Sequence, residues 1–120
     1  MSAVHEAFSW VVVAATAIAG TWALAAQWVE PLRHRLLWPA VIVGHVVVAV
    51  QVALGMSVVA IDGIEVNQTH LFYGFLTLMS VGLLYGYKDQ IGEWRYAMYG
   101  GGTLWIMGLA IRAMTLPGAA

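Results

Sequence analysis

The uncharged stretch LLWPAVIVGHVVVAVQVALGMSVVAI, residues 36–61, contains no Asp, Glu, Lys or Arg. As a helix it would be about 39 Å long, more than the ~30 Å hydrocarbon core of a bilayer. Three further runs, at 7–29, 70–87 and 96–111, also lack charge. Charged residues make up 9% of the chain and the mean hydropathy is +0.81, whereas a soluble domain has about 25% charged residues. The sequence therefore predicts an all-α integral membrane protein.

Four membrane-spanning helices are expected at residues 6–29, 36–61, 69–87 and 94–115. The connections between them are short, so consecutive helices must be antiparallel neighbours. We predict one domain, residues 1–120, folded as a transmembrane antiparallel four-helix bundle with up-down-up-down topology.

Basic residues indicate the orientation of this bundle. Arg33, Arg35, Lys88 and Arg95 fall at one end, and only Arg112 falls at the other. Because short cytoplasmic loops are enriched in Lys and Arg, the first end is expected inside and both termini outside a bacterial plasma membrane. The net charge of −1 gives no reason to expect nucleic acid. The absence of Cys excludes disulfides, thiolate metal sites and covalent haem attachment.

Two histidines, His5 and His70, are expected at the same depth, because the helices that carry them both begin at the outer end. Gly74 lies one turn below His70 on the same face. Small residues at such positions either allow close helix packing or leave room for a flat macrocycle. Neutral imidazoles across a bundle are standard axial ligands of haem iron. The face below His5 carries Ser9, Val12, Thr16 and Gly20. We therefore predict a haem b site with His5 and His70 as iron ligands.

A third face, on the helix at 94–115, is expected to complete this site. Gly101, Trp105, Gly108 and Arg112 share it, and we predict that both glycines face the bundle interior. Arg112 would then lie level with the two histidines, where it can bind a haem propionate.

The alternative for these residues is purely structural. An arginine within a span normally has a partner, and Asp62 or Glu65 of the outer loop could serve. His70 could likewise cap its helix and bond the same loop. Under the haem hypothesis, Tyr73 would bond a propionate or cap the pocket.

His45 lies roughly 13 Å from the inner surface, too far from His70 to share one iron. Met79 and Ser80 are expected at its depth, so a His–Met site is one interpretation. A hydrogen bond to Ser80 or to a backbone carbonyl is favoured, because buried polar groups are usually satisfied.

The stretch QVALGMSVVAIDGIEVNQTHLFYG, residues 51–74, resembles a unit of heme A synthase and of related small cytochrome-b-type four-helix membrane proteins. In that family a helix with Q-x-x-L-G runs outward, and the next helix opens with a haem-ligating histidine, here His70. The resemblance implies that His5, which opens the preceding outside-to-inside helix, is the other ligand, so it covers residues 5–74. Heme A synthase has two such units, commonly His-Arg at the first ligand, and an outer-loop glutamate, often with a cysteine, tied to catalysis. This chain has His5-Glu6 and no such combination, so the resemblance implies a haem-binding bundle rather than a synthase.

Three functions follow from these patterns. The first is a b-type haem protein for electron transfer, alone or as a subunit of a respiratory complex; whether it also binds a quinone is left open. The second is a cofactor-free accessory subunit of a larger membrane complex, since small-residue faces also serve association. The third is a small transporter, which would need a polar path that the middle of the spans lacks.

Overall fold

The computed structural model describes residues 2–61, 63, 68–87 and 92–115. Within these ranges the chain forms four α-helices, two short 3-10 helices and no strand, which confirms the all-α prediction. Helices α2, α3 and α4 begin and end within one residue of their predicted bounds, whereas α1 is shifted three to four residues toward the N-terminus. The elements are α1 (Ser2–Ala26), η1 (Glu30–Leu32), α2 (Leu37–Ile61), α3 (Gln68–Gly86), η2 (Gly92–Trp94) and α4 (Arg95–Thr115).

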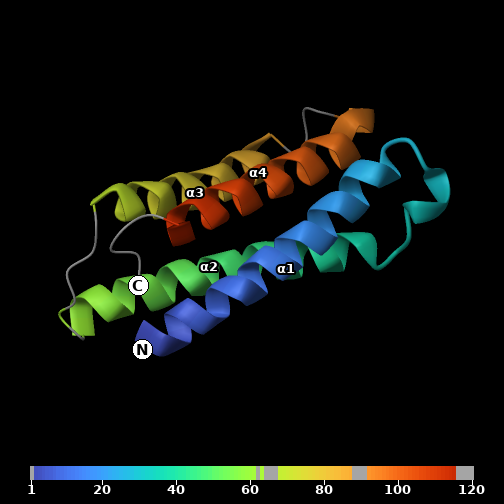
Figure 1. Cartoon of the computed structure of the whole chain (residues 1–120). Coiled ribbons are helices and arrows are strands. Elements are labelled where there is room, and N and C mark those ends of the chain that lie inside the picture. Colours follow the sequence, from blue (N-terminus) through green and yellow to red (C-terminus); the bar gives the residue numbers. More distant parts are fainter. Residues whose placement is uncertain (1, 62, 64–67, 88–91, 116–120) are drawn as a thin grey trace.

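The four α-helices run alternately up and down along an elongated bundle of 48 × 24 × 21 Å (Figure 1). α1 packs along α4 and α2, and α3 packs along α4, whereas α2 and α3 have little contact. The start of α1, the end of α2, the start of α3 and the end of α4 therefore lie at the same end of the molecule. We call this the His5 end.

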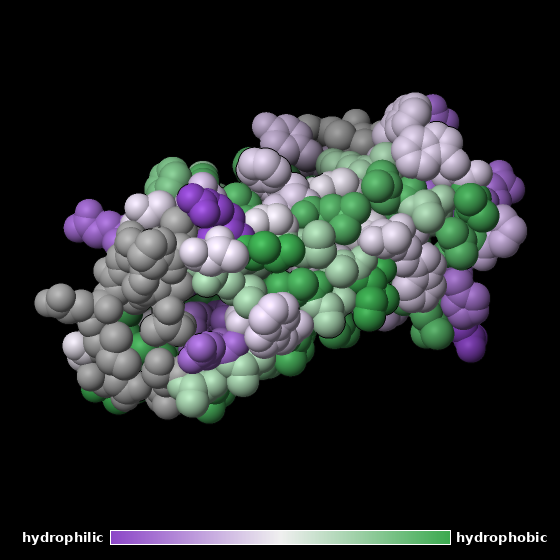
Figure 2. All heavy atoms as spheres, in the orientation of Figure 1, coloured by the Kyte–Doolittle hydropathy of each residue, from purple (hydrophilic) through white to green (hydrophobic). Residues whose placement is uncertain are grey.

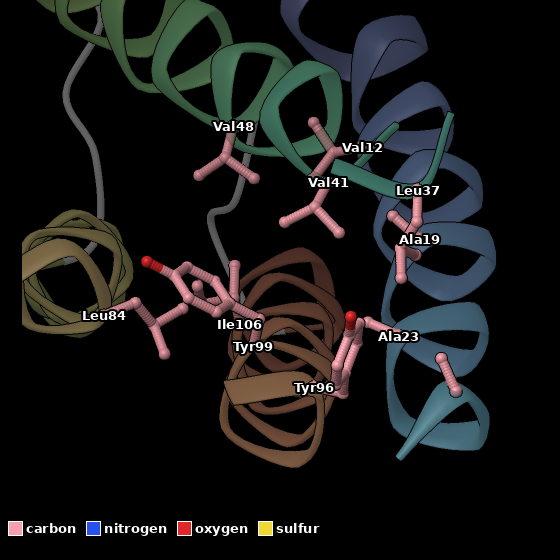
Figure 3. Packing of buried hydrophobic residues seen from close by; sticks show 11 residues of the cluster. Val12, Ala19, Ala23, Leu37, Val41, Val48, Leu84, Tyr96, Tyr99 and Ile106 are labelled. Atoms are coloured by element: carbon pink, nitrogen blue, oxygen red, sulfur yellow. The ribbon is translucent and has the colours of Figure 1, made fainter. Parts of the chain in front are cut away.

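Glycines allow α1 and α4 to approach each other closely. A Cβ placed on Gly100 would lie 2.2 Å from the backbone nitrogen of Leu24, and one on Gly20 would lie 3.0 Å from the Leu104 side chain. Around this contact, apolar side chains from all four helices form the core (Figure 3). Its members include Val12, Ala19, Ala23, Leu37, Val41, Val48, Leu84, Tyr96, Tyr99 and Ile106.

The prediction that Gly101 and Gly108 face the interior is wrong. Both are exposed, and a Cβ on either would meet no atom within 4 Å. The buried face of α4 instead follows Tyr99, Thr103 and Ile106. Residues two positions apart on a helix differ by about 200° around its axis, so 101 and 108 point away from this face. Trp105, predicted on the same face as these glycines, is 61% exposed for the same reason.

The outside of the bundle is largely apolar along its length. On the face shown in Figure 2, hydrophilic residues gather toward the two ends and hydrophobic ones cover the middle. Among the described helices, two segments are long and apolar enough to cross a membrane, Ala3–Ala26 and Leu37–Ile61, by length and composition. Exposed large apolar side chains occur on all four α-helices, for example Trp10, Ile18, Ile42, Val46, Phe72, Phe75, Leu83 and Ile111.

Candidate functional site

A cavity of about 540 Å³ lies in the half of the bundle at the His5 end. This volume is within the range of about 300–1,000 Å³ that is usual for small-molecule and cofactor sites. Its walls are mainly aliphatic and aromatic, and they come from all four α-helices. The polar side chains that line it are those of His5, Glu6, Ser9, Trp10, Gln51, His70 and Thr77.

The fold brings His5 and His70 together at this cavity, as the antiparallel topology predicts. Their ring centroids are 6.2 Å apart and their ring planes are nearly perpendicular, at 83°. His5 is only 8% exposed, and His70 is partly buried. Two imidazoles from α1 and α3 thus share one apolar cavity.

A backbone contact fixes the orientation of His70. Its Nδ1 lies 2.9 Å from the carbonyl oxygen of Ala113 on α4. Because a carbonyl can only accept, Nδ1 carries the proton and donates it. Nε2 therefore keeps its lone pair, which is the tautomer that a metal-ligating histidine needs.

His5 is positioned by α2. The Nε2 of Gln51 donates to the His5 carbonyl at 2.8 Å, and the His5 ring lies against Gly55, where a Cβ would be 3.0 Å from Cε1. Gln51 and Gly55 are four residues apart and so share one helical face. The Nδ1 of His5 and the Oε1 of Gln51 are both buried without a hydrogen-bond partner among the described residues. An unsatisfied buried polar group costs about 1–3 kcal/mol, so these two atoms mark a site whose polar contacts are incomplete.

The spacing of the two rings fits one metal ion between them. A metal–nitrogen bond is about 2 Å long, and the ring centroid lies about 1 Å beyond the nitrogen. Two imidazoles on opposite sides of one metal ion therefore have their ring centroids about 6 Å apart. In the part of the chain that the structure describes, no group of three or more His, Asp or Glu side chains could hold a metal ion. A pair of imidazoles suits a group that brings its own equatorial ligands, as haem does. The orphaned Nδ1 of His5 and the cavity beside it are compatible with such a group.

Of the other residues predicted for this site, Gly74 lines the cavity and Tyr73 and Arg112 do not. A Cβ on Gly74 would meet nothing within 4 Å. Arg112 is exposed because it lies on the outward face of α4. Asp62 and Glu65, the proposed partners of Arg112, lie outside the described residues.

His45 belongs to a separate polar cluster in the other half of the bundle. Its Nδ1 is 2.9 Å from the Tyr85 hydroxyl and its Nε2 is 2.9 Å from the Thr103 hydroxyl. The side chain is 3% exposed and its ring stacks near that of Tyr99. The prediction of Ser80 or a carbonyl as its partner is therefore wrong. Ser80 instead donates to the carbonyl of Leu76, on its own helix.

Sequence reasoning missed the roles of three side chains, Gln51, Tyr85 and Thr103. Gln51 carried a usable signal, because it is a polar residue in the middle of an apolar span, four positions before a glycine. Thr103 could have been found by counting helical rise, because it lies as far into α4 as His45 lies into α2. Tyr85 lies one residue from the end of α3, so depth alone does not indicate it. Comparison with protein-family models, curated proteins and solved structures finds no match to this chain. The geometry of the residues is therefore the basis for a functional assignment.

Proposed function

We propose that this chain is a small membrane-embedded b-type haem protein for electron transfer, with His5 and His70 as the two axial ligands. The observation that carries the proposal is the ring spacing of 6.2 Å at one wall of a mainly apolar cavity. The tautomer of His70, with Nδ1 donating to Ala113, supports it independently.

The proposal includes insertion of all four α-helices in a bilayer, with both termini outside. The length of the bundle, 48 Å, is sufficient for the ~30 Å hydrocarbon core and part of the headgroup regions. The apolar outer surface would face lipid, which removes the cost of exposing it to water.

Orientation is tested by cysteine labelling, since the chain has no native Cys. Gln68→Cys and Glu30→Cys place single thiols at exposed positions near opposite ends of the bundle. An impermeant thiol reagent should label position 68 in intact cells and position 30 only after lysis. The reverse pattern would contradict the orientation, and equal labelling of both in intact cells would contradict insertion.

Bound haem would supply one-electron redox chemistry to the site. His5 and His70 would both hold the iron, which favours electron transfer over the binding of an exogenous ligand. The aliphatic walls from α2 and α3, such as Val48 and Leu78, would exclude water. The cavity lies at the His5 end of the bundle, so bound haem would be near the solvent or headgroups at that end.

A visible spectrum tests this function. Protein purified in mild detergent, as isolated or after addition of haemin, should show the sharp reduced α band of a low-spin bis-imidazole haem. His5→Ala and His70→Ala should each abolish the spectrum or make it high-spin, whereas His45→Ala should keep it low-spin. Retention of the low-spin spectrum in both outer variants would refute the ligand assignment. A wild-type chain that binds no haem would favour the cofactor-free accessory subunit.

A further inference from the structure

Gln51 is the least expected polar residue near the cavity, because it lies in the uncharged span of α2 between Val50 and Val52. Its amide is partly used: Nε2 donates to the His5 carbonyl at 2.8 Å. That contact fixes the orientation of the amide, since a carbonyl can accept only from the NH₂ end. Oε1 is left as a buried acceptor without a donor among the described residues.

The neighbouring histidine has the complementary deficit. Nδ1 of His5 is buried and has no partner in the described part of the chain. One hydrogen bond, from Nδ1–H of His5 to Oε1 of Gln51, would satisfy both atoms. It would also fix the proton on Nδ1 and leave Nε2 of His5 free as a ligand, as the Ala113 carbonyl does for His70.

We propose that Gln51 is the positioning residue for the axial ligand His5: its Oε1 accepts from Nδ1–H when the site is loaded, while its Nε2 keeps the His5 backbone in place. This inference rests on the proposed haem function. It predicts an asymmetric pair of ligands, one oriented by a backbone carbonyl from α4 and the other by a side-chain amide from α2. Only the second can be changed by substitution.

Two variants at position 51 separate the acceptor role from a merely structural one. Gln51→Leu removes both the donor and the acceptor, whereas Gln51→Glu removes the donor to the His5 carbonyl and keeps an acceptor. If Gln51 only held the backbone of His5, the two variants would behave alike. If its Oε1 accepts from Nδ1–H, the midpoint potentials of the two variants should shift in opposite directions from that of wild type. The reason is that a stronger acceptor makes the imidazole more basic and stabilises ferric iron.

The measurements are haemin affinity and the midpoint potential of the detergent-purified full chain. Gln51→Leu should bind haemin about 10- to 100-fold more weakly than wild type, as is typical when the partner of a ligand is removed. Its potential should rise, and that of Gln51→Glu should fall below wild type. Gln27→Leu is the matched control: Gln27 also uses its amide on the backbone, bonding Glu93 and Ala97 at the other end of the bundle. It should leave both quantities unchanged.

The outcomes distinguish this inference from the function on which it rests. If wild type binds haem with a low-spin spectrum but Gln51→Leu and Gln51→Glu share one affinity and one potential, Gln51 does not accept from His5 and only the inference fails. If Gln51→Leu does not fold, Gln51→Met, which has nearly the same length and no strong donor or acceptor, takes its place in both measurements. A wild-type chain that binds no haem overturns both.

Discussion

Gly100→Ala should destabilise the folded bundle more than a methyl group added at any other position. The new Cβ would lie 2.2 Å from the nitrogen and 2.5 Å from the Cα of Leu24. Non-bonded atoms pack best at about 3.5–4.0 Å, so α1 and α4 would have to separate by about 1 Å along their shared interface. Overpacking of this kind costs about 1–3 kcal/mol, and a clash against backbone cannot be relieved by a side-chain rotation.

The neighbouring residue provides the control. Gly101→Ala adds the same methyl group to the same helix, where nothing lies within 4 Å, and should stabilise the chain by up to about 1 kcal/mol through helix propensity. Unfolding of both variants in one mild detergent, followed by circular dichroism against temperature or added denaturing detergent, measures the difference. The gain in helix propensity is common to both variants, so the expected gap is the overpacking cost, about 1–3 kcal/mol in favour of the Gly101 variant. Equal stability of the two variants would refute the close approach of α1 and α4.

Two further predictions concern the two polar clusters. Thr103→Val leaves Nε2 of His45 buried without its partner and should lower the free energy of unfolding by about 1–3 kcal/mol without changing haem binding; a haem spectrum lost with this variant would contradict the separation of the clusters. Gly55→Val should displace the His5 ring, because even a Cβ would lie 3.0 Å from Cε1, and should weaken haemin binding, whereas Gly82→Val, on α3 away from the cavity and with nothing within 4 Å of its Cβ, should not. Equal haemin affinity in the two glycine variants would contradict the placement of His5.

The four helices were predictable because charge is confined to their ends. α2 shows this well: it lies within one residue of its uncharged run, 36–61. The approach of His5 and His70 was predictable for a related reason. Short loops force antiparallel neighbours, and both histidines open helices that start at the same end.

The rotation of α4 about its axis was not predictable. Three successive glycines, 100–102, place a small residue on every side of the helix, so the pattern does not indicate which one meets a neighbour. The structure uses Gly100 against Leu24 and Gly102 against Leu84, and leaves Gly101 outside. An apolar surface adds to the difficulty, since a helix that is hydrophobic all round has no preferred buried face in its sequence.

The partners of His45 show a second limit. Depth counted from sequence indicates Ser80, but the imidazole bonds Tyr85, which lies about 8 Å further along α3, so its long side chain and the rotation of α3 decide the contact. These two helices have little contact, so no close packing of small residues indicates their rotation. Gln51 was overlooked for a different reason. Its neighbours in the sequence are all apolar, and its role is indicated only by the structure, where its Oε1 is buried without a partner among the described residues.

The pairing of α1 with α4 also sets an order of events during synthesis. These helices are the most distant α-helices along the described chain, yet they form its most extensive interface. Until α4 emerges, the small-residue face of α1 has no partner, and His70 lacks the Ala113 carbonyl that fixes its tautomer. A nascent chain that ends before α4 would therefore carry both histidines but no finished site, and under the proposed haem function cofactor capture would be delayed until the last helix has docked.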